Sequence, residues 1–196
     1  MRTHSFTRWL CAAAGAAMLT TGAYADVLLE LDLSVPNEVT INATGGLSAA
    51  TVSGSDTTGV YFENFYSASG SALLETLISG NLTNAENPTD NSPNLFRGGA
   101  GSDPGLNIWS WSSDFTVSFT AGSLAFVGSA TWALDAAEYA DMLGGAASGN
   151  LYFPADTFDD IASGATLLGS YAVVPEPASL SLFGLLLGLG AWRSRR

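Results

Sequence analysis

Val27-Leu28-Leu29-Glu30-Leu31-Asp32-Leu33-Ser34-Val35 is the stretch that decides the fold class of this 196-residue chain. Apolar residues at 27, 29, 31, 33 and 35 alternate with mostly polar ones, and the run ends at Pro36-Asn37. A period of two puts alternate side chains on opposite faces of a strand. The stretch therefore predicts a half-buried β-strand.

Further β-rich runs follow, separated by turns rich in glycine and serine. They cover residues 39–43, 49–53, 60–65, 73–79, 106–111, 115–120, 124–134 and 166–173. Strands at this spacing are typical of an antiparallel sandwich or jelly roll. We therefore predict that residues 26–172 form a mostly β, single antiparallel β-sandwich or jelly-roll-like domain with one or two short helices.

Two helices and one long loop are expected to interrupt these strands. Asp135, followed three residues later by Glu138, predicts a capping box that opens a helix at 136–143. A second helix is expected at 156–162. Residues 80–105 lack apolar periodicity and predict a loop around Arg97, which either forms an internal ion pair or grips a carboxylate or sugar.

Charge and residue content exclude several functions. From residue 26 to residue 174 there are seventeen carboxylates, one arginine and no lysine, a formal charge of −16. Nucleic acid is excluded as a partner, because phosphate binding needs clustered Lys and Arg. The only histidine and cysteine, His4 and Cys11, precede this region, so it lacks the residues of Ser-His-Asp and Cys-His catalysis. We expect a non-enzymatic body, with a small carboxylate-dependent hydrolase as the third alternative.

Two clusters are candidate binding sites. Asp156, Asp159 and Asp160 could supply oxygen ligands to calcium, the one cofactor left open, or could be a solvated helix start. Trp109 and Trp111 share a side if 106–111 is a strand, so they could stack on a sugar or pack in the core.

The first 25 residues have the organisation of a secretory signal peptide. Arg2 and Arg8 precede and begin a short apolar run, and Ala23-Tyr24-Ala25 provides small residues at the cleavage position. Signal peptidase is therefore expected to cut after Ala25 and leave Asp26 as the mature N-terminus.

The C-terminal tail has three features in a fixed order. Pro175-Glu176-Pro177 is followed by an uncharged apolar run at 178–192 and then by a basic cluster. The apolar run predicts a short transmembrane helix, whose flanking positive charges stay cytoplasmic. The cluster consists of Arg193, Arg195 and Arg196.

This tail, residues 173–196, resembles the PEP-CTERM sorting domain of exported proteins. The resemblance implies that Pro175, Glu176 and Pro177 form a sorting motif and that an exosortase, an integral-membrane enzyme, processes the chain. It also implies export across the inner membrane of a Gram-negative bacterium, with the body periplasmic during transient anchoring and then at the cell surface or outside the cell.

We expect the exported body to have a structural or adhesive role in an extracellular matrix or biofilm, with exopolysaccharide as a partner. The alternative is a carbohydrate- or calcium-binding module.

Overall fold

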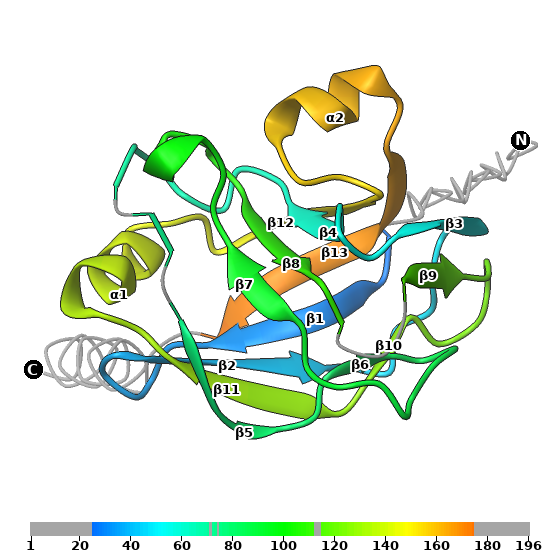
Figure 1. Cartoon of the computed structure of the whole chain (residues 1–196), viewed down its shortest axis with the longest axis horizontal. Helices are drawn as coiled ribbons and strands as arrows, with labels where there is room; N and C mark the ends of the chain where they lie inside the picture. The colour runs from blue at the N-terminus through cyan, green and yellow to red at the C-terminus, as the bar shows by residue number, and fades with distance from the viewer. Residues whose placement is uncertain (1–24, 71, 74, 112–114, 175–196) are drawn as a thin grey trace, which may run out of the picture.

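The computed structural model describes residues 25–174, apart from Ser71, Leu74 and residues 112–114 (Figure 1). The described residues form β-strands, two α-helices and one 3-10 helix, η1. In chain order the elements are β1 (Val27–Asp32), β2 (Glu38–Ala43), β3 (Val52–Ser55), β4 (Val60–Phe62), β5 (Thr76–Gly80), β6 (Thr83–Asn84), β7 (Asn94–Phe96), η1 (Gly99–Gly101), β8 (Leu106–Trp109), β9 (Thr116–Phe119), β10 (Phe126–Val127), β11 (Ser129–Ala133), α1 (Ala136–Leu143), β12 (Ser148–Phe153), α2 (Phe158–Ser163) and β13 (Thr166–Val174).

Nine strands form one curled sheet in the order β5-β11-β2-β1-β13-β12-β4-β8-β7. β1 and β13 run parallel, and the other neighbours are antiparallel. The sheet wraps until its edge strands β5 and β7 approach each other (Figure 1). Side chains bridge this seam: the Leu95 N–H donates to Glu75 Oε1 at 2.9 Å, and the Leu82 N–H donates to Ser92 Oγ at 3.0 Å. The result is a nearly closed, mixed barrel.

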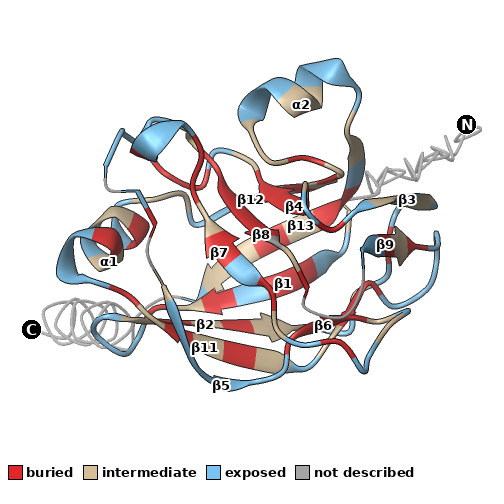
Figure 2. Cartoon of the chain, in the orientation of Figure 1, coloured by how far each residue is buried: buried red, intermediate tan, exposed pale blue. Residues whose placement is uncertain are grey.

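Apolar side chains from the sheet fill the barrel interior. Buried residues alternate with partly exposed ones along β2 and β11 (Figure 2). An aromatic cluster of Phe62, Phe65 and Tyr171 lies in this core, with ring centroids 5.3 to 6.4 Å apart. Burial of such large apolar surfaces is the main stabilising contribution to the fold.

The mostly β class and the two short helices are confirmed, whereas the antiparallel sandwich is wrong. One sheet curls on itself, and its last strand β13 inserts beside β1 in parallel. Strand spacing along the sequence could not reveal this pairing, because it joins the two ends of the body. The alternation in β1 is also broken by an irregularity between Val27 and Leu29, so Val27 is exposed and both Leu28 and Leu29 are buried.

The predicted loop at 80–105 contains the short elements β6, β7 and η1, and β12 was not predicted. The sequence of β12 begins with Ser-Gly-Asn, which has little strand propensity, but β13 and β4 hydrogen-bond it on both sides. The helix at 136–143 is confirmed with its capping box: Asp135 Oδ1 accepts from the Glu138 N–H at 2.8 Å, and Glu138 Oε2 accepts from the Asp135 N–H at 2.9 Å.

Candidate functional site

The last strand of the barrel leads directly into the Pro-Glu-Pro motif. Val174 ends β13 and is still paired with Asp32 of β1, while the Val173 N–H donates to the Ala147 carbonyl at 2.8 Å. β13 lies between β1 and β12, so both of its edges are hydrogen-bonded. Pro175 follows at once and has no N–H for a ladder. No linker therefore separates the folded body from the motif.

The end of the barrel at which β13 stops is capped by α1 and the turn between β1 and β2 (Figure 1). The Tyr139 hydroxyl of α1 donates to the Leu33 carbonyl at 2.6 Å, and the Leu134 N–H donates to the Asn37 carbonyl at 2.8 Å. These bonds fix the helix and the turn to each other. We call this end, formed by residues 33–37, Val174 and the face of α1 that carries Tyr139 and, one turn later, Leu143, the exit face.

The predicted signal-cleavage point lies at the opposite end, because β1 and β13 run parallel. The Asp26 carbonyl accepts from the Ser170 N–H at 2.8 Å, and Asp26 Oδ2 accepts from the Leu47 N–H at 3.0 Å. Asp26 is thus held in the fold from the first residue of the predicted mature chain. Ala23 lies outside the described residues, and the cleavage stays a prediction.

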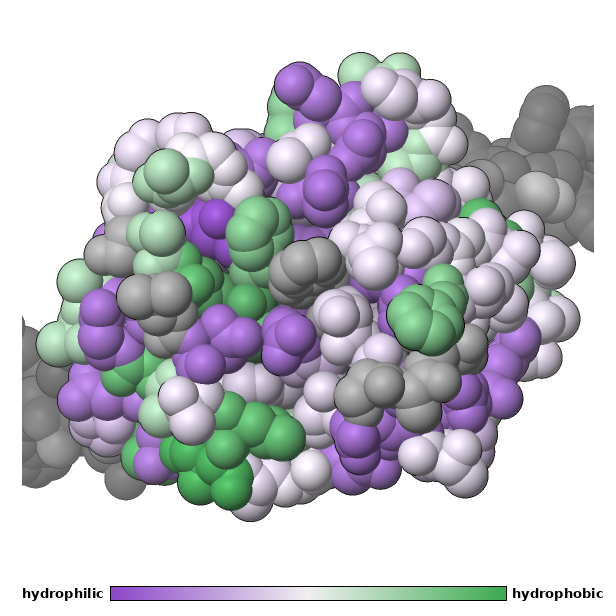
Figure 3. Space-filling view, in the orientation of Figure 1, coloured by the Kyte–Doolittle hydropathy of each residue, from purple (hydrophilic) through white to green (hydrophobic). Residues whose placement is uncertain are grey.

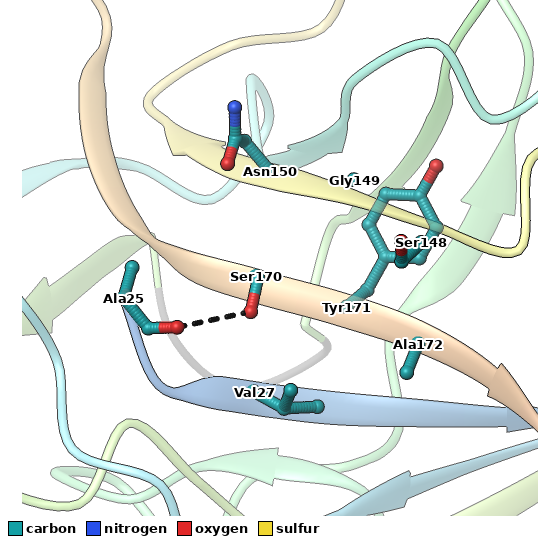
Figure 4. A pocket seen from close by; sticks show the side chains of 8 residues that line it. All are labelled: Ala25, Val27, Ser148, Gly149, Asn150, Ser170, Tyr171 and Ala172. Atoms are coloured by element: carbon teal, nitrogen blue, oxygen red, sulfur yellow. Dashed lines mark hydrogen bonds between the residues drawn. The ribbon is translucent and has the colours of Figure 1, made fainter. Parts of the chain in front are cut away.

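A shallow groove of about 340 Å³ crosses β12, β13 and the start of β1 (Figure 4). Ser148, Asn150 and Ser170 supply polar side chains, and Asn150 Nδ2 donates to Glu63 Oε2 at 2.8 Å. Ser170 Oγ donates to the Ala25 carbonyl at 3.2 Å. Hydroxyl and amide groups of this kind can hydrogen-bond to a polyol. These residues were missed in the sequence, since β12 was not recognised as a strand.

Arg97, the one basic residue of the body, is buried, with 2% of its surface exposed, and its guanidinium nitrogens are hydrogen-bonded within the protein. Its Nη1 lies 3.4 Å from Asp141 Oδ2, and its Nη2 donates to the Ala68 carbonyl at 2.6 Å. Its Nε donates to the Asp103 carbonyl at 3.0 Å, and the guanidinium lies 3.7 Å over the ring centroid of Tyr66. Burial raises the pKa of Tyr66 above its ordinary value, although the nearby Arg97 acts in the opposite direction. Arg97 therefore forms the internal ion pair, and it does not face solvent.

The three aspartates proposed for calcium are placed at the start of α2. Asp160 Oδ2 accepts from the N–H groups of Asp156 and Thr157 at 2.9 and 3.1 Å. Burial and the Asp160 carboxyl raise the pKa of Asp156. Burial acts in the same direction on Asp160, but its hydrogen bonds with the backbone and side chains of Asp156 and Thr157 together outweigh burial and lower the Asp160 pKa.

Asp159 lines a separate cleft between η1 and α2. Within the described ranges, no group of three or more Asp, Glu, His or Cys side chains is arranged to hold a metal ion. The capping role of Asp160 corresponds to the helix-start interpretation of this cluster.

The tryptophan pair does not form an exposed platform that includes both rings. β8 ends at Trp109, and Ser110 has φ of 60°, so the alternation of a strand does not continue to Trp111. Trp111 is 2% exposed and belongs to the core. The side chain of Trp109 lies outside the described part of the structure. Stacking of a sugar on Trp111 would require it to leave the core.

Two adjacent exposed apolar residues lie on the edge strand β5. All five of its residues are exposed, including Leu77 and Ile78, and Figure 3 shows the resulting apolar patch. No helix of the described residues is long and apolar enough to cross a membrane. The predicted helix at 178–192, the motif at 175–177 and the arginine cluster lie outside the described residues.

The last strand of the barrel-like body runs directly into a Pro-Glu-Pro motif, the position at which a C-terminal sorting signal would begin. Residues 173–196 match the family model described as the PEP-CTERM protein-sorting motif. The motif implies export, processing by an exosortase and a location at the cell surface. Comparisons with curated proteins and with solved structures found no match.

Proposed function

We propose that the chain is a non-catalytic structural or adhesive protein of the cell surface or extracellular matrix, which an exosortase releases from its membrane tail. The observation that carries the proposal is the direct junction between the hydrogen-bonded strand β13 and the sorting motif. Because the nearly closed barrel ends where the signal begins, we expect it to remain folded when the tail is removed. The body is thus suited to release as a folded domain.

The charge of the body supports a matrix role. Seventeen carboxylates are opposed by Arg97 alone, which is buried. A high net charge keeps an exported protein soluble, while divalent ions bridge carboxylates on neighbouring molecules. We expect millimolar calcium to increase light scattering of the purified body, and magnesium to do so less. A flat calcium titration would contradict calcium bridging without affecting the sorting proposal.

The sorting proposal is tested by intact mass spectrometry of the protein from the native host and from a strain that lacks the exosortase. We expect a chain that begins at Asp26 and ends near residues 175–177 in the wild type, and a retained tail in the deletion strain. Replacement of Pro175, Glu176 and Pro177 by alanine is the matched control and should reproduce the deletion. An unchanged tail in both strains would make the chain an ordinary anchored protein.

A second candidate function is carbohydrate binding at the groove on β12 and β13. The observation that favours it is the row of hydroxyl and amide groups from Ser148, Asn150 and Ser170 on one outer surface (Figure 4). Retention on exopolysaccharide should fall when Asn150 is replaced by alanine and should persist in the presence of a chelator. Equal retention of Asn150→Ala and the wild type would remove this candidate.

A further inference from the structure

The exit face is joined to the predicted transmembrane helix by a short spacer. Residues 175–177 span at most about 10 Å when fully extended. The apolar run begins at Ala178. Val174 is locked into β13 by its pairing with Asp32, so unwinding the chain to lengthen this spacer would break a central strand. With the predicted helix at 178–192 in the membrane, the spacer keeps Val174 within about 10 Å of the bilayer surface.

An integral-membrane enzyme that binds Pro175-Glu176-Pro177 has to approach this junction from the membrane. Proteases bind several residues of extended substrate, and the residues before the motif are held in a sheet. The enzyme thus has no free chain on the body side of the motif. The part of the enzyme outside the membrane must therefore contact the exit face before its catalytic groups can reach the motif.

The exit face has the composition of a contact surface. Val35 at the tip of the β1–β2 turn is 51% exposed, Leu143 at the end of α1 is 45% exposed and Val174 is 36% exposed. Among described residues the nearby charges are all negative, since the single basic side chain, Arg97, is buried. A partner surface that fits is apolar with a basic rim, because it would cover the exposed apolar side chains and face Asp32 and Asp135.

From this placement we propose that the exit face is the surface on which the exosortase docks the folded body. Processing then requires a specific contact with Val35 and Leu143 in addition to the Pro-Glu-Pro motif. This inference rests on the proposed function, because it takes the exosortase as the processing enzyme. It adds that the body, and not only the tail, determines how fast the chain is processed.

The test compares processing rates of full-length chains in the native host by pulse-chase and intact mass. Val35→Asp combined with Leu143→Asp should slow tail removal by about tenfold, because charge is placed in an apolar contact. Leu124→Asp is the matched control. Leu124 is 44% exposed and bridges to Leu47, which bonds to Asp26 at the other end of the barrel. It should process at the wild-type rate.

A second variant separates docking from a folding defect. A Gly/Ser spacer of about fifteen residues between Val174 and Pro175 reaches roughly 20 Å on average and frees the motif from the body. The spacer should restore fast processing to the double aspartate variant, and circular dichroism of the purified body checks that this variant is folded.

A wild-type rate of tail removal for the double variant without a spacer would overturn the docking inference. Failure of the spacer to restore fast processing of the double variant would also overturn it. Both outcomes leave the sorting proposal intact. A wild-type chain whose tail is not removed by the exosortase would instead overturn the proposed function.

Discussion

The two halves of the curled sheet are held together in different ways. In the long-strand half, β12, β13, β1, β2 and β11 have five or more residues each. In the short-strand half, β4, β8 and β7 have only three or four residues each, and buried polar side chains complete the contacts. A short ladder leaves backbone groups to be satisfied by side chains. Loss of a polar side chain should therefore affect the short-strand half more than the long-strand half.

The largest expected effect is at Trp111, which follows β8. Trp111→Ala removes a ring that is 2% exposed and should lower the free energy of unfolding by about 3–5 kcal/mol. Urea denaturation followed by circular dichroism measures this loss. In the long-strand half, the Thr40 and Thr131 hydroxyls are 2.8 Å apart on the outer face. Thr40→Ala should lower the free energy of unfolding by less than about 1 kcal/mol. Similar losses for both would contradict the comparison.

The next effect in size is at Arg97. Arg97→Met removes the bonds to Ala68, Asp103 and Asp141 and leaves their oxygens without this donor. The free energy of unfolding should fall by about 3 kcal/mol, as for other buried ion pairs that lose one partner. Arg97→Lys keeps the charge but cannot reach three acceptors from one planar fork, so it should recover only part of the loss. Full recovery with lysine would show that charge alone matters there.

The sequence could predict what depends on neighbouring residues. The strand that begins at Val27 and the helix that Asp135 caps follow from local patterns, and both are present. The burial of Arg97 could not be predicted, because two of its three acceptors, the Ala68 carbonyl and the Asp141 carboxylate, lie 29 and 44 residues away in the chain. Asn150 and Ser170 meet in the groove only because β12 pairs with β13. The sorting signal of the tail could be predicted without a structure, because its three features follow one another along the chain.

A smaller effect is expected at the N-terminus of α1, which supports the exit face. Asp135→Ala removes the acceptor for the Ala137 and Glu138 N–H groups, whose bonds are 2.7 and 2.8 Å long. The loss of a cap should cost about 1 kcal/mol in thermal or urea unfolding. Asp135→Asn retains an acceptor and is the control. If alanine and asparagine were equally destabilising, the charge and not the cap would be responsible.

The smallest effect concerns Glu75, whose side chain joins the two halves across the seam by accepting from the Leu95 N–H at 2.9 Å. Burial raises the pKa of Glu75 above its ordinary value, and the neighbouring Glu138 carboxylate adds to the shift. The native state therefore holds this proton more tightly than the unfolded chain, so stability falls as the pH rises from the ordinary pKa through the raised one.

Glu75→Gln keeps the acceptor oxygen without the charge. It should leave the Tm unchanged at pH 4 and raise it slightly at pH 7, measured by thermal unfolding across that range. A lower Tm for Glu75→Gln at pH 7 would mean that the charged hydrogen bond to Leu95 outweighs the cost of burying the carboxylate. The seam would then be held by charge, as the Arg97 cluster is, and would belong with the short-strand half.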